Sequence, residues 1–251
     1  MKWLLNFFPR PWLIQWSYFF RPFLRWWFRG HQLTDPIDGS HYRKFLPYGY
    51  QNLRKNALCP GTLSLERHRL LWLYLKRNTS FLDRSISVLH VAPEQIFFDL
   101  FKTFQHWTYT TTDLHSPLAD VRADLCALPM KDNSYDLILC NHVLEHIVED
   151  TKAMKELYRV LKVGGTLIAQ VPLEMDRSQT YEDFSIIDPE ERAKAFGQYD
   201  HVRIYGQDFF DRLKKAGFST ASPTAQDICP SDEIIRYALL KHEIIPVAVK
   251  Q

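Results

Sequence analysis

Apolar and polar residues follow two different rhythms in the middle of this 251-residue chain. Residues 135–140 (YDLILC) and 166–171 (TLIAQV) are short, nearly continuous apolar runs, which are typical of parallel strands buried on both faces. Between them, residues 147–163 place apolar side chains at helical spacing. Gly164-Gly165 is expected to end that helix. The order predicts a right-handed strand–helix–strand unit.

The same patterns extend the predicted sheet on both sides of this unit. Residues 86–91 (ISVLHV) and 107–112 are predicted as strands, with a helix over 97–104 between them. Residues 234–240 and 244–249 are predicted to form an antiparallel hairpin that closes the sheet. We therefore expect an α/β fold with a Rossmann-like, mostly parallel sheet. Folds of this kind bind ligands at the carboxyl ends of their strands.

The composition changes at the N-terminus. Residues 1–30 hold five of the seven Trp, six of the 17 Phe and five basic residues, but no acidic residue. Aromatic side chains recur there at helical spacing, at Trp12, Trp16, Phe19, Phe23 and Trp26. This pattern is typical of an amphipathic helix at a membrane surface. The alternative is a helical arm that packs on its own domain or on a second subunit.

Charge and cysteine content limit the partners, the location and the metal sites to be expected. The net charge is +2 and the basic residues form no stripe outside the N-terminus, so a nucleic-acid partner is not expected. The four cysteines are scattered, which favours a reducing, cytoplasmic location. Asp35, Asp38, Cys59 and Thr62 stand at the spacing of zinc-ribbon ligands, but only one of them is a thiol. We expect a degenerate zinc-ribbon-like segment, and no metal site is predicted.

Several short motifs of the central stretch occur in a fixed order. They are Asp124-Leu125 with Leu128-Pro129, Ser134-Tyr135-Asp136, the run from Asn141 to His146, and Arg159-Val160-Leu161-Lys162 with Gly164-Gly165. Through them, the stretch resembles the second half of a class I S-adenosylmethionine (SAM)-dependent methyltransferase of the type 11 group. The resemblance implies a seven-stranded fold with an antiparallel closing strand and SAM as the cofactor. It also implies methyl transfer to a small-molecule or lipid-linked acceptor.

This resemblance suggests a division of the chain into three parts. Residues 1–30 are the aromatic and basic segment, residues 31–62 the degenerate ribbon, and residues 63–251 the methyltransferase domain. Within the domain, residues 174–206 form a long insertion, which we interpret as a lid over the acceptor. The sequence makes no prediction about the oligomeric state.

The first turn of the implied cofactor site departs from the family pattern. The family has a glycine-rich turn after the first strand, whereas this chain has Ala92-Pro93-Glu94 there, and His90 stands where the family has an acidic residue. We interpret it as a variant cofactor turn formed by these four residues. Glu94 would accept from the ammonium group of the cofactor, or would only begin the next helix.

The adenosine side of the implied site lies in two later turns. Asp113, next to Leu114, ends a predicted strand and would accept both ribose hydroxyls. Asp124 would accept from the adenine amino group, while Leu125 would present its amide and pack on the ring. Alternatively, Asp124 caps the turn that follows it.

The candidate catalytic residues are His142, His201 and Tyr199. The backbone of Asn141 would line the methionine arm of the cofactor, and His142 would face the methyl group or the acceptor. His201 or Tyr199 would meet the acceptor from the insertion, or these residues would only anchor it. A base is needed if the acceptor is a hydroxyl or an amine.

Two other functions stay open. The glycine-free turn is also compatible with a SAM-binding but catalytically silent scaffold at the membrane surface. A nucleic-acid methyltransferase is the third possibility, and the near-neutral charge argues against it. If residues 1–30 bind lipid, the protein is expected as a peripheral protein at the inner face of the membrane.

Overall fold

The structure is a computed structural model that describes residues 21–49, 53–116 and 119–251. The chain divides into two compact units. We call them the hairpin unit (Met1–Tyr74 and Ala225–Glu243) and the sheet unit (Leu75–Thr224 and Ile244–Gln251). The boundary between them falls inside helix α3 (Glu66–Asn78).

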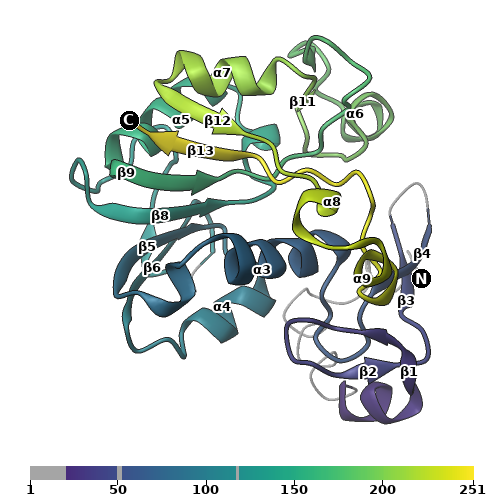
Figure 1. Ribbon diagram of the computed structural model, residues 1–251. Helices are drawn as coiled ribbons and strands as arrows, with labels where there is room; N and C mark the ends of the chain where they lie inside the picture. The colour runs from purple at the N-terminus through teal and green to yellow at the C-terminus, as the bar shows by residue number, and fades with distance from the viewer. Residues whose placement is uncertain (1–20, 50–52, 117–118) are drawn as a thin grey trace. The chain divides into compact units, whose positions relative to one another are not determined.

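The sheet unit is built on a seven-stranded sheet with the order β12-β13-β9-β8-β5-β6-β7 (Figure 1). Its strands are β5 (Ile86–Val91), β6 (Trp107–Asp113), β7 (Val121–Arg122), β8 (Tyr135–Cys140), β9 (Leu161–Ile168), β12 (Phe218–Ala221) and β13 (Val247–Lys250). The strands from β9 to β7 are parallel, and β13 is antiparallel to both of its neighbours. This topology confirms the predicted fold class.

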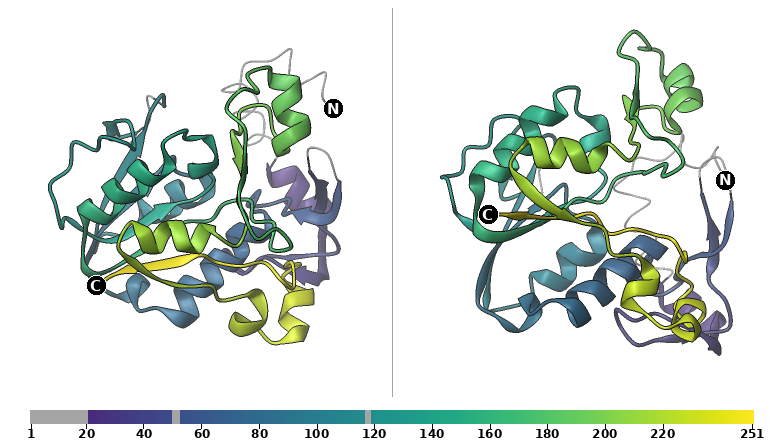
Figure 2. Two further views of the ribbon diagram at one scale, coloured as in Figure 1. Left: turned by 90° about the horizontal axis from the view of Figure 1, so that it is seen from above. Right: turned by 45° about the horizontal axis from the view of Figure 1, so that its top comes forward.

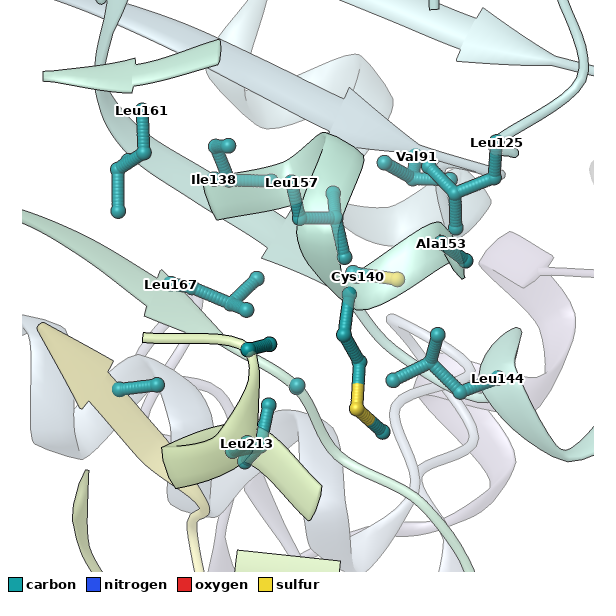
Figure 3. Packing of buried hydrophobic residues seen from close by; sticks show 14 of the residues in the cluster. Val91, Leu125, Ile138, Cys140, Leu144, Ala153, Leu157, Leu161, Leu167 and Leu213 are labelled. Carbon is teal, nitrogen blue, oxygen red and sulfur yellow. The ribbon is translucent and has the colours of Figure 1, made fainter. Parts of the chain in front are cut away.

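Helices cover the two faces of this sheet. Ala153 and Leu157 of α5 (Asp150–Val160) and Leu213 of α7 (Phe209–Lys215) join side chains of β8 and β9 in one buried cluster (Figure 3). Neighbouring residues of a strand point to opposite faces, and so Leu89 of β5 belongs to this cluster while His90 faces the other way. There, Phe101 of α4 (Gln95–Phe101) packs with its ring centroid 6.1 Å from that of His90.

Two predicted elements are wrong in detail. Residues 234–240 are not a strand, because α9 (Ser231–Arg236) begins before them and β12 takes the place beside β13. Gly164-Gly165 does not end the preceding helix. That helix, α5, ends at Val160, and both glycines lie within β9, where its register against β8 shifts. Gly164 has a φ of 77°, which a glycine adopts without steric cost.

The insertion after β9 belongs to the sheet unit and carries little regular structure. It contains α6 (Pro189–Phe196) and a two-stranded ribbon of β10 (Tyr181–Glu182) and β11 (Arg203–Ile204). Short 3-10 helices occupy Phe81–Asp83 (η1) and Leu144–His146 (η2). In the ranges described, no helix is long and apolar enough to cross a membrane.

Among its described residues, the hairpin unit has two small antiparallel hairpins, and its second segment, Ala225–Glu243, holds two short helices. The hairpins pair β1 (Arg29–Thr34) with β2 (His41–Tyr42) and β3 (Leu46–Tyr48) with β4 (Arg54–Leu58). The helices are α8 (Ala225–Ile228) and α9.

Residues 1–20, with Trp12, Trp16 and Phe19, lie outside the described residues. Of the rest of the predicted amphipathic segment, residues 21–27 are helical.

Three of the four zinc-ribbon positions lie together in a hydrogen-bonded group. The buried carboxylate of Asp35 accepts hydrogen bonds from the hydroxyls of Thr62 and Ser64, the latter at 2.8 Å. Burial, and then the charge of Asp35, raises the pKa of the Cys59 thiol to about 12. Asp38 points elsewhere and pairs with Arg25 at 2.8 Å.

The guanidinium of Arg69 completes this group. Arg69 is fully buried and donates to the carbonyl oxygens of Ala57, Ser64, Tyr237 and Ala238 at 2.8–3.1 Å. We refer to Asp35, Thr62, Ser64 and Arg69 as the Asp35 cluster. Internal hydrogen bonds hold these residues together, and the degenerate zinc ribbon stays a prediction.

Candidate active site

Three buried polar side chains at the carboxyl edge of the sheet have incomplete hydrogen bonding. Thr112 lies at the end of β6, Asn141 directly follows β8, and Gln170 lies two residues after β9. Thr112 Oγ1, Asn141 Nδ2 and both amide atoms of the Gln170 side chain have no hydrogen-bond partner among the described residues. An unsatisfied buried polar group costs about 1–3 kcal/mol. We call these residues the sheet-edge group, and a ligand or ordered water is expected to complete their bonds.

Two sharp backbone turns lie at the same edge. Ala92, which follows β5, has a φ of 44°, and His142, two residues after β8, has a φ of 53°. The amide of Ala92 donates to the carbonyl of Thr112, and that of His142 to the carbonyl of Gln170, each at 2.7 Å. Positive φ is uncommon for residues other than glycine, and such strain clusters at functional sites. The first turn therefore takes a left-handed conformation without a glycine.

Both ring nitrogens of His90 are engaged inside the fold. His90 is fully buried, with Nδ1 2.7 Å from the hydroxyl oxygen of Tyr109 and Nε2 2.8 Å from Glu94 Oε2. Glu94 also provides the N-cap position of α4. His90 therefore orients the carboxylate of Glu94. The predicted cofactor contacts of His90, Ala92, Pro93 and Glu94 stay predictions.

The two aspartates of the implied adenosine side both accept hydrogen bonds from the backbone that follows them, Asp113 at the end of β6 and Asp124 just before a turn. The half-buried Asp113 accepts the amides of His115 (2.7 Å) and Ser116 (2.6 Å) on the same oxygen, Oδ1. Asp124 is exposed and accepts the amide of Cys126 at 2.8 Å, which is the capping bond of the alternative interpretation. Leu114 is half exposed, and the side chain of Leu125 is buried in the core cluster.

His142 lies beside a buried carboxylate that the sequence did not single out. Its Nδ1 is 3.1 Å from Oε1 of Glu145, which is 1% exposed. Burial opposes ionisation of Glu145, but the hydrogen bond from His142 and the charges of His142 and His146 hold the pKa of Glu145 below its ordinary value. The spacing of three residues between His142 and Glu145 was the available signal.

The insertion brings His201 to the same carboxylate. His201 Nε2 lies 4.0 Å from Glu145 Oε1, and the rings of His146 and His201 meet edge to face with their centroids 4.8 Å apart. Burial lowers the pKa of His201. Tyr199 is 47% exposed and lies at the surface of the insertion.

A buried arginine ties the insertion to η2. Arg203 donates to the carbonyl oxygens of Leu144, Ile147 and Val148, and its Nε is 2.8 Å from Glu182 Oε2. These contacts place the insertion at the carboxyl ends of β8 and β9 (Figure 2). The sequence did not predict this role for Arg203.

Comparison with known proteins places a family domain over this edge. Residues 91–169 match the family described as methyltransferase domain. An uncharacterized protein of Methanocaldococcus jannaschii is 42% identical over 66 residues, which are 26% of this chain and 29% of that protein. The ubiquinone/menaquinone biosynthesis C-methyltransferase UbiE of Ruegeria sp. is 26% identical over 157 residues, which are 50% of this chain and 62% of that protein. The chain thus spans less than two thirds of the length of either relative.

A solved structure supports the fold over most of the chain. The crystal structure of the [4+2]-cyclase SpnF has a TM-score of 0.51 and 16% identity, and the match covers 86% of this chain and 91% of SpnF. This likeness concerns the fold alone, and a fold by itself does not define a reaction. The family match over residues 91–169, and not this likeness, confirms the predicted class, a class I SAM-dependent methyltransferase domain with SAM as its cofactor.

Proposed function

We propose that this protein is a SAM-dependent methyltransferase that acts on a small-molecule or lipid-linked acceptor. The sheet-edge group carries the proposal, because its buried polar atoms need partners where open α/β sheets bind ligands. The family match covers two of its three members and ends at residue 169, next to Gln170.

The polar groups of the edge suit the parts of the cofactor. Asp113 would accept the ribose hydroxyls through Oδ2, since its two amide bonds both go to Oδ1. Asp124 and Leu125 would contact the adenine, and the side-chain amide of Asn141 would donate toward the methionine arm. SAM supplies a methyl group on a sulfonium, which a nucleophile displaces directly. The residues of the chain would align cofactor and acceptor and exclude water.

His142 is the proposed base. A carboxylate oxygen only accepts hydrogen bonds, so the bond to Glu145 puts a proton on His142 Nδ1, and in the neutral form of the ring Nε2 has a lone pair. The side chain is 31% exposed, so Nε2 can take a proton from an acceptor hydroxyl or amine. Tyr199 is exposed and is therefore better placed than the buried His201 to touch an acceptor.

Calorimetric titration with SAM and with S-adenosylhomocysteine tests the cofactor site. Asp113→Ala is expected to weaken binding by about 1.5–3 kcal/mol, the range for lost hydrogen bonds to a charged group. Asp211→Ala, on the exposed side of α7, is the matched control and should bind like the unchanged protein. Absence of binding at millimolar SAM would refute the proposal.

A SAM-binding but catalytically silent scaffold is the alternative. Pro93 favours it, because proline has no amide to donate to the cofactor in the first turn. Incubation with methyl-labelled SAM and a cell extract separates the two functions. Labelling that requires the protein and falls at least tenfold in His142→Ala supports the enzyme. Cofactor binding without any labelled product supports the scaffold.

Membrane attachment through residues 1–30 is a further part of the proposal. Phe23, Trp26 and Trp27 are 54%, 68% and 53% exposed, and exposed aromatic side chains suit a lipid interface. Removal of residues 1–30 should abolish flotation with liposomes, and Trp26→Ala with Trp27→Ala should weaken it. Tyr48→Ala, at a position 46% exposed, is the control. Unchanged flotation of the truncated protein would argue for a packing arm.

A further inference from the structure

Three side chains beside the proposed base have the geometry of a metal-ligand set. Glu145 and His146 lie in η2, and His201 comes from the insertion. One ligand atom from each lies within 4.8 Å of the others. Over the residues that the structure describes, this is the one such group of three or more His, Cys, Asp or Glu side chains.

The hydrogen bonds of both histidines leave the correct nitrogen for a metal. Nδ1 of His146 is 3.2 Å from the carbonyl oxygen of Asp200, and Nδ1 of His201 is 3.2 Å from that of Phe196. A carbonyl oxygen only accepts, so each Nδ1 carries a proton, and in the neutral form of each ring Nε2 has the lone pair that a metal needs. A backbone carbonyl that orients the ring in this way is the usual support of a metal-bound histidine.

The carboxylate gives an independent indication. Glu145 is 1% exposed, and its Oε1 accepts from His142. Its second oxygen, Oε2, is buried and finds no hydrogen-bond donor in the described ranges. A charged oxygen in this situation is costly, and a cation would remove the cost.

We propose that Glu145, His146 and His201 bind one divalent transition-metal ion. Two imidazoles and one carboxylate favour Zn²⁺, Fe²⁺ or Co²⁺ over Mg²⁺ and Ca²⁺, which prefer oxygen ligands. Ligand atoms around a tetrahedral ion with bonds of about 2.1 Å stand about 3.4 Å apart. The group must therefore close by up to about 1.4 Å, which the partly exposed side chain of His146 permits.

The ion would lie where an acceptor is expected. Three protein ligands leave at least one coordination position open, and that position would take an oxygen atom of the acceptor. This role rests on the proposed function, whereas ion binding itself does not. An ion with an open position favours an acceptor whose methylated group is, or adjoins, a hydroxyl or carbonyl oxygen.

Titration of the full-length protein with Co²⁺, after chelator treatment and without SAM or acceptor, tests the site. We expect one equivalent of Co²⁺ to bind with visible absorption bands of nitrogen and oxygen ligation, and Zn²⁺ to displace it. His146→Ala should weaken binding more than tenfold, because loss of even a supporting residue costs a metal site about 10–100-fold. Glu145→Gln, which keeps the size of the side chain, should do the same.

His242→Ala is the matched control, since His242 is exposed in the hairpin unit. It should leave Co²⁺ binding unchanged, and circular dichroism should show that every variant is folded. Absence of bands up to millimolar Co²⁺, or bands that survive both His146→Ala and Glu145→Gln, would overturn the proposal. The assay contains neither cofactor nor acceptor, so its failure would leave the SAM-binding prediction intact.

Discussion

The Asp35 cluster and the sheet-edge group differ in how complete their hydrogen bonds are. In the Asp35 cluster, Asp35 takes both hydroxyls and Arg69 gives its hydrogen bonds to backbone carbonyls, all within one unit. In the sheet-edge group, Asn141 and Gln170 keep buried atoms that no described residue satisfies. Apart from the partly exposed Thr62, the members of both groups are buried, so burial does not explain the difference.

The comparison separates a structural role from a binding role. A buried network whose hydrogen bonds are all formed stabilises the fold. Loss of one member leaves the others buried without partners, which lowers the free energy of unfolding. A buried group with unsatisfied polar atoms destabilises the free protein. A ligand that satisfies these atoms restores the lost stability when it binds. Variants in the two groups should therefore move stability and cofactor affinity in different ways.

The largest effect is expected from Arg69→Ala. This change leaves four carbonyl oxygens, two of them buried, without their donor and Asp35 without its neighbouring positive charge, so the free energy of unfolding should fall by about 3–5 kcal/mol. Urea denaturation measures it. Lys55→Ala, an exposed change in the same unit, should cost less than about 0.5 kcal/mol. An equally small loss in Arg69→Ala would mean that the cluster is not structural.

Unlike Arg69→Ala, Gln170→Leu should weaken cofactor binding without destabilising the fold. Leucine removes both unsatisfied amide atoms and keeps much of the volume, so the free protein should be unchanged or more stable by about 1 kcal/mol. SAM binding should weaken by about 1–3 kcal/mol because a polar partner is lost. Thermal unfolding and calorimetry measure the two effects. A marked loss of stability with unchanged affinity would make Gln170 structural as well.

Ala92→Gly tests the strained turn beside the sheet-edge group. At a φ of 44°, a side chain costs about 1–2 kcal/mol and glycine costs some chain entropy, so a net gain of about 0.5–1 kcal/mol is expected. SAM affinity should stay within twofold. Ala193→Gly, inside α6, should instead lose about 1 kcal/mol. If both variants changed the free energy of unfolding in the same direction, backbone strain at Ala92 would be contradicted.

The smallest effect is expected from a pair outside both groups, Lys162 and Asp136, whose side chains are 39% and 29% exposed. Burial by itself would raise the pKa of Asp136. Hydrogen bonds from Lys162 and the Ser87 amide outweigh it and hold this pKa below its ordinary value. A lowered pKa stabilises the fold above the unfolded value, and that contribution disappears as the pH falls.

Lys162→Met should therefore cost only about 0.2–1 kcal/mol at pH 7. The difference from the unchanged protein should shrink below about pH 4. Urea denaturation at both pH values measures it. A cost as large as that of Arg69→Ala would show that complete networks are not special to the buried cluster.

Local patterns predicted much of the sheet. The strands at 86–91 and 135–140 agree with β5 and β8 because both are continuous apolar runs buried on both faces. The strand predicted over residues 234–240 was wrong because a short apolar run suits a helix equally well. Only the structure reveals that Ile234 is buried while its neighbour Ile235 is 74% exposed.

The candidate site was predicted in part for a similar reason. Asn141 and His142 follow directly on a predicted strand, so the sequence placed them at the carboxyl edge of the sheet. Thr112 and Gln170 look like ordinary strand-end residues in the sequence. Whether a buried polar atom has a partner depends on neighbouring strands, and no local pattern contains that information.

The sequence by itself determined the class of this protein, since strand and helix periodicity and the order of short motifs are local properties of the chain. The tertiary structure alone decided that Glu145, His146 and His201 come together. His201 is distant from the other two in the sequence, and it reaches them because Arg203 anchors the insertion to the backbone of η2 and the residues after it. Such contacts depend on the packing of separate segments, which periodicity does not encode.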